Sequence, residues 1–530
     1  MKYNSNEKGI TLLVLVITMA VLLILATVTI NAVFGDGGLI YQSDETRGRA
    51  ENMITADEEK TNGIMEEYAN VMAEDSQIQI GEFEPVQTPE PETGGQEFEM
   101  GYGVIEIKWL KEDTYSVSDT PNAPKVKAIS NGTMELVKYV EGGATEQERW
   151  VAGTDYEYVA GIGTADNNQS KWANARVTID GIDSYFVWIP RYAYRIVYFD
   201  SEASKNEYKN GTITEEQAIE DGKIVGYSDS RGIVTAEGKR VDNITSESNT
   251  THIMVSEDYF MAHPAFIDGS KTGYQNGEWD DELEGLWIGK YESSLINTTN
   301  NSNANTSGSA GNILLSERTD RALAIQPGMK SWRNIQIGYM WTNAKEFATE
   351  LESHMLKNSE WGAVVYLTES AYGRNGNEIA ENTSDDYITG SAEGSDGSVS
   401  NDYTSAVGQK ASSTGNIYGI YDLSGCAGEY VAGYYNGPDT ETYIDYGSSF
   451  ASIGGNSTKY ATTYNSTGFE DDSAMQNYKY GDATYEIRRW HSDYADFVFS
   501  AALFIRRGGD YAESYENAGI FFYSCDIRWS

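Results

Sequence analysis

The chain has 530 residues, a formal net charge of −43 and only two cysteines, Cys426 and Cys525. Phosphate binding requires clustered Lys and Arg, so this acidity argues against a nucleic acid as the partner. Two cysteines cannot form the disulfide framework of a small secreted domain, and they leave two alternatives open: one bridge, or two free buried thiols. The length is sufficient for two or three ordinary domains.

The most distinctive segment lies at the start of the chain, where residues 9–34 form an uncharged apolar run. A helix needs roughly 20 apolar residues to cross a bilayer core, so residues 10–34 are predicted to be a transmembrane anchor; the alternative is a buried core helix. Lys2 and Lys8 precede the run, and positive residues stay in the cytoplasm. The expected protein is therefore a single-pass membrane protein with its large C-terminal part at the cell surface.

The same segment resembles the N-terminus of a type IV prepilin. A short basic leader, residues 1–9, ends in Lys8-Gly9 and is followed by Ile10 and an unbroken apolar stretch. The resemblance implies cleavage between Gly9 and Ile10. Val14 stands where pilins usually carry a glutamate that sets subunit register, which argues against assembly into a filament.

Two further segments precede the large domain. Residues 35–74 are predicted to be a helical stalk, because apolar residues recur at helical spacing within residues 45–74. That stripe fits either packing on its own domain or pairing with other copies of the chain. Residues 75–100 combine acid, Pro and Gly without periodicity, which predicts an extended acidic linker.

From Gly101 onward the sequence predicts short strands separated by Gly/Asn/Ser/Asp loops. Residues 101–179 form a β-rich connecting region that begins the large domain, and strands are expected at 104–109 and 185–190. Helices are expected from Trp341 to Leu356 and around residues 367–372, the latter with an N-cap at Thr368. Residues 296–311 and 382–414 are predicted loops.

Segments along residues 180–530 resemble the formylglycine-generating-enzyme branch of the C-type lectin fold. They are, in family order, YFVWIPRYAYR from Tyr185, LWIGKYE from Leu286, GNIYGIYDLSG from Gly415 and Arg507-Gly508-Gly509 before the last hairpin. The resemblance implies a loop-rich lectin-like domain. With the segments before it, the expected fold is of the α+β class: an N-terminal transmembrane helix and linker, followed by this domain. Trp188, Trp287, Trp341 and Tyr421 are the aromatic residues expected in its core.

The enzyme activity of that family is not expected here. Its catalytic members carry two cysteines shortly after the Arg-Gly-Gly motif, where this chain has Glu513 and Ala518. A carboxylate and a methyl group cannot replace a thiolate site. The four histidines show no metal-ligand spacing. No cofactor is predicted, with Ca²⁺ at an acidic loop such as Asp280-Asp281 or Asp471-Asp472 as the alternative.

The C-terminal region, residues 490–530, alternates framework residues with Tyr, Asp, Ser and Phe, a composition typical of binding surfaces. The predicted ligand-binding residues are Trp490, Asp493, Tyr494, Asp510, Tyr511, Glu513, Ser514, Tyr515, Phe522, Tyr523, Ser524 and Asp526. The alternative is a set of ordinary loops in a chain that is rich in tyrosine throughout. A lectin-like domain with such a C-terminus resembles the variable proteins of diversity-generating retroelements, which implies C-terminal diversification directed by a template.

Together these features predict a membrane-anchored, non-catalytic receptor or adhesin that binds an extracellular protein or glycan. The alternatives are a structural pseudopilin with a lectin-like tip and a residual enzyme of the sulfatase-modifying type. Oligomerisation through residues 45–74 is a further expectation of the stalk.

Overall fold

The computed structural model describes residues 102–526, with gaps at 112–113, 165–166, 230–231, 237–252, 254, 256–257, 271–276, 305–311, 393–400, 436–457, 465–478, 485, 488–489, 496–503 and 512–517. Residues Gly95–Ser530 belong to one compact unit. The region predicted as a connecting segment, residues 101–179, therefore lies in the same unit as the rest of the large domain.

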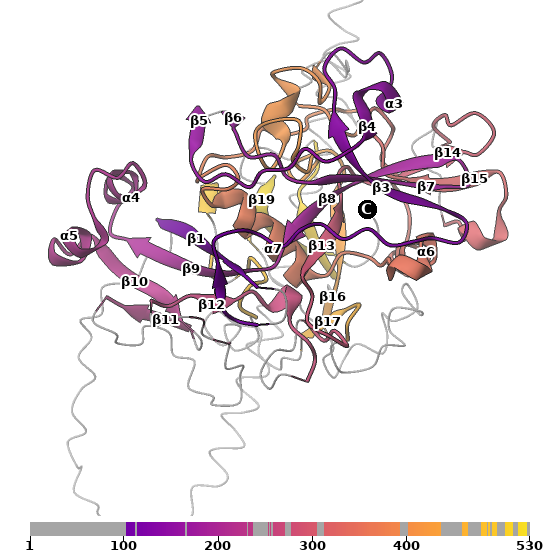
Figure 1. Ribbon diagram of the computed structural model, residues 1–530. Helices are drawn as coiled ribbons and strands as arrows, with labels where there is room; N and C mark the ends of the chain where they lie inside the picture. The colour runs from indigo at the N-terminus through magenta and orange to yellow at the C-terminus, as the bar shows by residue number, and fades with distance from the viewer. Residues whose placement is uncertain are drawn as a thin grey trace, which may run out of the picture. The chain divides into compact units, whose positions relative to one another are not determined.

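Three antiparallel or mixed sheets form most of this unit (Figure 1). The first has the order β11 (Gly232–Thr235), β10 (Ile224–Asp229), β9 (Tyr192–Phe199), β1 (Gly103–Leu110) and β2 (Val117–Ser118), and β12 (Met261–Ala262) also pairs with β9. The second has the order β13 (Gly285–Gly289), β8 (Ile182–Pro190), β7 (Asn174–Ile179), β3 (Gly132–Tyr139) and β4 (Trp150–Ala152). The third has the order β17 (Thr462–Tyr464), β16 (Glu429–Tyr435), β18 (Phe504–Gly508) and β19 (Gly519–Asp526).

Smaller elements complete the described part. The two-stranded sheets are β14 (Ser294–Asn297) with β15 (Arg321–Ala324) and β5 (Ile162–Thr164) with β6 (Asn167–Asn168). The α-helices are α3 (Glu146–Arg149), α4 (Glu202–Lys209), α5 (Glu215–Glu220), α6 (Ile337–Phe347) and α7 (Asn358–Glu369).

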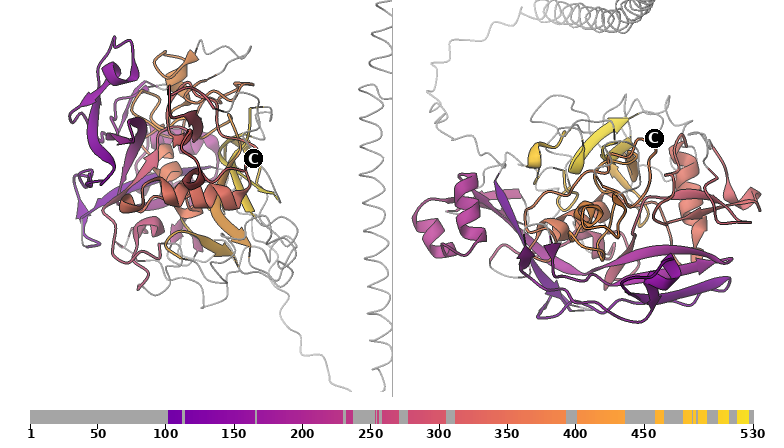
Figure 2. Two further views of the ribbon diagram at one scale, coloured as in Figure 1. Left: turned by 90° about the vertical axis from the view of Figure 1, so that its right-hand side faces the viewer. Right: turned by 90° about the horizontal axis from the view of Figure 1, so that it is seen from above.

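Helix α7 lies at the centre of the main core, and all twelve of its residues are buried. Its side chains pack in one apolar cluster with residues of β8, β9, β16, β18 and β19. In the right-hand view of Figure 2, the indigo-to-magenta strands of the N-terminal half and the yellow strand of the C-terminus lie on opposite sides of the unit. The core therefore joins the beginning and the end of the described chain.

Both predicted strands are confirmed, and both predicted helices need correction. The helix expected at Trp341–Leu356 begins earlier, at Ile337, and ends at Phe347. Beyond it, Ser353 Oγ accepts a hydrogen bond from the Ala348 backbone N–H at 2.8 Å, and Glu352 adopts a left-handed conformation with φ of 56°. These features are incompatible with a continuous helix.

The helix expected around residues 367–372 is the last part of α7, and Thr368 is not an N-cap. Its hydroxyl donates to the Val364 carbonyl, 2.7 Å away, inside the helix. The true start is closed by Glu360, whose Oε2 accepts a hydrogen bond from the Lys357 backbone N–H at 2.8 Å. The sequence carries no Ser, Thr or Asp at that cap, which is why its start was missed.

The predicted fold class and membrane anchor are corrected by the structure. Strands are the main element of the described residues, so the α+β class with a transmembrane helix is wrong for this part of the chain. No described helix is long and apolar enough to cross a membrane. The longest, α7, has 12 residues, about 18 Å at the usual helical rise.

The remaining N-terminal predictions lie outside the described residues. These are the leader with Gly9 and Ile10, the apolar segment 10–34, the stalk 35–74 and the linker 75–100. Because no described helix is long and apolar enough to cross a membrane, the prediction of a single-pass protein at the cell surface is withdrawn.

Candidate functional site

The predicted ligand-binding residues fall into three groups in the structure. Trp490, Asp493, Phe522, Tyr523 and Ser524 are buried in the fold. Tyr494 is 46% exposed, and Asp510 and Tyr511 are partly exposed. Glu513, Ser514 and Tyr515 lie outside the described residues, as does the side chain of Asp526, the last residue of β19. Five of the twelve are thus core side chains, which are not accessible to a ligand.

Arg506, on strand β18, connects several of the predicted residues. Its Nε donates to Ser524 Oγ at 3.3 Å, and its guanidinium lies over the Phe522 ring, 5.4 Å from the centroid. Its other end faces Asp510 Oδ2, 3.8 Å away. Gly428 makes room for this arginine, because a Cβ at that position would lie 2.6 Å from Arg506 Cδ.

Three side chains stack beside the last hairpin, β18–β19: Tyr511, which follows β18, and Arg333 and Tyr387 from two separate loops. The Arg333 guanidinium lies 3.3 Å from the centroid of the Tyr387 ring. Tyr387 in turn meets Tyr511 edge to face, with centroids 4.7 Å apart and an interplanar angle of 77°. We call Arg333, Tyr387, Arg506, Asp510 and Tyr511 the C-terminal surface.

The backbone and electrostatics fix this stack. Tyr387 sits at φ of 55°, and the Tyr511 backbone N–H donates to the Cys426 carbonyl at 3.1 Å. Burial, with the neighbouring Tyr511, raises the pKa of Tyr387 to about 12. Arg333 Nε is buried without a hydrogen-bond partner among the described residues. An arginine that stacks on an aromatic ring is typical of a binding anchor.

The hairpin that carries the surface is held from below by Arg507, which is fully buried. Its Nε donates to Asn358 Oδ1 at 2.8 Å, and its NH1 group donates to the Ala483 carbonyl at 2.9 Å. Trp361 Nε1 donates to the Ile520 carbonyl of β19 at 2.9 Å. Gly508 and Gly509 have φ of 76° and 71°, a backbone conformation that glycine adopts without steric cost.

A second buried group explains why Trp490 and Asp493 are structural. Asp493 Oδ2 accepts from the Phe521 backbone N–H at 2.9 Å, and burial raises the pKa of Asp493 to about 7. His491 Nε2 lies 3.2 Å from Glu369 Oε2, and this carboxylate raises the pKa of His491 to about 9 in spite of burial. These contacts attach the 490–493 segment to α7 and β19.

Three buried acids surround Cys426, close behind the C-terminal surface. Glu292 Oε1 accepts from the Ala427 backbone N–H at 3.0 Å, and Asp422 accepts from the Gly390 backbone N–H at 2.8 Å. Burial and mutual repulsion raise the pKa values of Glu292 and Glu429 well above their usual range, and burial raises that of Asp422 to about 6. Protonated acids in such a site serve as hydrogen-bonding groups of the scaffold.

Cys426 is a free, buried thiol, so the alternative of a Cys426–Cys525 bridge is excluded. Burial raises the pKa of its thiol well above the usual value, and the neighbouring acids add to this effect. A thiol of this kind is unreactive, because the thiolate is the nucleophile and the metal ligand. Ala518, at one of the two positions compared with the family's cysteines, is buried, and Glu513 lies outside the described residues.

Metal ligation has little support in the described part of the chain. No group of three or more His, Cys, Asp or Glu side chains is placed there to hold a metal ion. In the acidic loop named as the alternative Ca²⁺ site, Asp280 pairs with Lys459, with its Oδ2 2.5 Å from the ammonium. The other acidic pair, Asp471-Asp472, lies outside the described residues.

Sequence reasoning missed Arg333, Tyr387 and Arg506. Arg506 was visible as half of the Arg506-Arg507 pair, and the strand alternation that buries Arg507 places Arg506 on the other face. Arg333 and Tyr387 carried no such signal, because they reach Tyr511 only through tertiary packing of distant loops.

No protein-family model matches the chain, and no curated protein matches it either.

Proposed function

We propose that the chain is a non-catalytic ligand-binding protein, and that the C-terminal surface is its binding site. The observation that carries the proposal is the stack of Arg333, Tyr387 and Tyr511, which joins the last hairpin to two distant loops. Tyr and Arg are enriched at the centres of protein interfaces, where each combines a large contact area with hydrogen-bonding groups. A protein partner therefore fits this surface better than a glycan.

The environment of the surface suits recognition more than chemistry. Asp510 is occupied by Arg506, and the nearest thiol, Cys426, is buried with a raised pKa. The scaffold beneath is rigid, since Arg507 and Trp361 hold the hairpin to α7. A rigid base under exposed aromatic residues lowers the entropic cost of binding.

The resemblance to variable proteins of retroelements belongs to the same proposal. Asp510 and Tyr511 directly precede residues 512–517 in the sequence. Substitutions in residues 510–517 would therefore change residues of the binding surface or their sequence neighbours, and would leave the framework residues Arg507 and Gly508 unchanged. Sequencing the DNA beside the gene tests this: a near-copy template repeat and a reverse-transcriptase gene support it. Identical C-termini across many isolates, with no template, contradict it.

Binding is tested by probing arrays of extracellular proteins and of glycans with the labelled full-length chain. Arg333→Ala and Tyr511→Ala are compared with the controls Arg318→Ala, an exposed arginine paired with Asp320, and Tyr156→Ala, another half-buried tyrosine. The proposal expects signals that disappear in the first pair and persist in the controls, with circular dichroism unchanged. Signals that survive in all four variants contradict it.

A further inference from the structure

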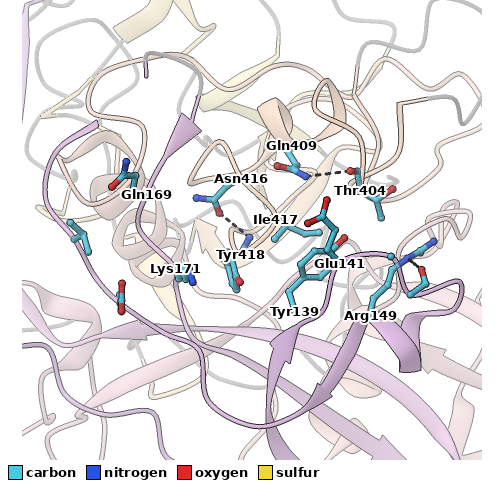
Figure 3. A pocket seen from close by; sticks show the side chains of 14 residues that line it. Tyr139, Glu141, Arg149, Gln169, Lys171, Thr404, Gln409, Asn416, Ile417 and Tyr418 are labelled. Carbon is cyan, nitrogen blue, oxygen red and sulfur yellow. Dashed lines mark hydrogen bonds between the residues drawn. The ribbon is translucent and has the colours of Figure 1, made fainter. Parts of the chain in front are cut away.

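A cavity of about 940 Å³ shares no lining residue with the C-terminal surface. It opens between the end of β3, the turn that leads to α3, the segment 157–171 and the loop 404–418 (Figure 3). Small-molecule sites in proteins typically measure about 300–1,000 Å³. The cavity is therefore large enough for a ligand of several rings.

Two tyrosines give the cavity its aromatic surface. Tyr139 and Tyr418 each pack edge-on against buried Trp150, with centroids 5.4 Å and 6.1 Å from it. The Tyr418 hydroxyl also donates to Asp155 Oδ2 at 2.7 Å, which fixes the direction of that ring. Figure 3 shows both rings in the lining, with Ile417 between them. Rings held in this way offer apolar faces on which the C–H face of a sugar can pack.

The cations of the lining are already neutralised by acids outside it. Lys171 Nζ lies 3.1 Å from Asp155 Oδ1, and Arg149 NH1 lies 2.8 Å from Glu146 Oε1. Glu141 and Glu157, both exposed, have no ion pair among the described residues. The charge that remains for a ligand is negative, which disfavours anions and favours an ammonium group.

Neutral polar groups surround these charges. Gln409 Nε2 donates to the Thr404 carbonyl at 3.3 Å, which leaves its amide oxygen as an acceptor. Gln169 is exposed at the other side of the cavity, beyond Asn416 and Tyr418 in Figure 3. Amides on opposite sides of the lining, together with the two exposed carboxylates, match a ligand with many hydroxyl groups.

We propose that this cavity binds an oligosaccharide of two or three units that carries free amino groups. The tyrosine faces take the rings, Gln169 and Gln409 take hydroxyl groups, and Glu141 and Glu157 take the ammonium groups. This inference is independent of the C-terminal surface.

The test uses isothermal titration calorimetry of the full-length chain with four probes: the glucosamine disaccharide, its N-acetylated form, cellobiose and spermidine. The glucosamine disaccharide is expected to bind most tightly. E141Q/E157Q removes two exposed charges. It is expected to lower the affinity for the glucosamine disaccharide by about 3- to 20-fold and to leave the affinity for cellobiose unchanged. The matched variant E220Q, on helix α5, is expected to change neither.

The aromatic contribution is tested by Tyr139→Leu, which keeps an apolar side chain against Trp150 and is expected to weaken the binding of all three disaccharides. No heat with any sugar in the millimolar range overturns the proposal. Equal affinity for the amino and N-acetylated sugars overturns the role of the carboxylates. Tighter binding of spermidine than of the disaccharide identifies a polyamine site instead and also overturns it.

Discussion

Arg507 donates through Nε to Asn358 Oδ1 at 2.8 Å, so the last hairpin is bound to the first turn of the central helix. The two residues are 149 positions apart in the sequence. Burial lowers the pKa of Arg507 to about 10, and its donors are used by Asn358 and by the carbonyls of Asp482 and Ala483. The C-terminal surface depends on this connection, because two of its residues, Arg506 and Asp510, lie close to Arg507 in the same hairpin.

Arg507→Lys is expected to destabilise the protein by about 3 kcal/mol, because an ammonium cannot reproduce the fork of donors and leaves buried oxygens unpaired. Urea unfolding followed by tryptophan fluorescence measures the change. The control Arg318→Lys, at an exposed ion pair, is expected to have no measurable effect. A loss below about 1 kcal/mol for Arg507→Lys contradicts the assigned role.

Gly362→Ala is expected to destabilise the fold by about 2–3 kcal/mol through overpacking. A Cβ at Gly362 would lie 1.8 Å from the Gly481 carbonyl oxygen, so α7 or the 481 loop must move. Gly289→Ala is the matched control, because a Cβ there finds its nearest neighbours at 3.4 Å. Thermal unfolding of both variants decides the matter: equal melting temperatures rule out the close approach.

Stability is expected to fall as pH rises from about 5 to about 9. Burial raises the pKa of Glu486 from 4.5 to about 7, although Tyr366 and Tyr194 donate hydrogen bonds to it. The carboxylate of Glu369 raises the pKa of His491 from 6.5 to about 9. Both groups bind a proton more tightly in the folded state, and such groups favour folding more strongly as pH falls.

Glu486→Gln is expected to reduce this dependence between about pH 4.5 and 7, where Asp493 and Asp422 also contribute, and to leave the effect of His491, between about pH 6.5 and 9, in place. Integrated over this pH range, the lost stabilisation corresponds to a free energy on the order of 3 kcal/mol, at 1.36 kcal/mol per pKa unit. Guanidinium unfolding at several pH values measures it. An unchanged pH dependence in the variant refutes the assignment to Glu486.

Cys426 is expected to resist thiol reagents in the native protein, because it is buried and its pKa is raised. The measurement uses a Cys525→Ser background, so that Cys426 is the sole thiol, and compares maleimide labelling with and without denaturant. Slow labelling in buffer and complete labelling in denaturant are expected. Rapid labelling in buffer indicates an accessible thiol and reopens the question of thiol chemistry.

Local pattern predicted the strands well, because alternation and turn residues are visible in a few neighbouring positions. The strands predicted at 104–109 and 185–190 are examples. Trp188, Trp341 and Tyr421 are buried as expected, whereas Trp287 is only half-buried. The start of α7 could not be predicted, because its N-cap position holds Lys357 rather than Ser, Thr or Asp, and the side chain of Glu360 accepts the hydrogen bond from the Lys357 backbone N–H.

The binding surface was predicted only in part, for a physical reason. Composition does not distinguish a tyrosine on a surface from one in the core, so Tyr511 and buried Tyr523 looked equivalent in the sequence. Their difference follows from tertiary structure: Tyr523 lies on a paired strand above Arg507, with ring and guanidinium 5.3 Å apart. Tyr511 follows the strand end and reaches Tyr387.

The most direct test of the account is a double-mutant cycle on Arg333 and Tyr511, with affinity for a captured protein partner measured by surface plasmon resonance. Each single alanine variant is expected to weaken binding by at least about 10-fold, and the double variant by less than the product of the two, because the side chains act through one stack. Affinities that remain within about twofold of the original protein in all three variants contradict the claim that this surface binds the ligand.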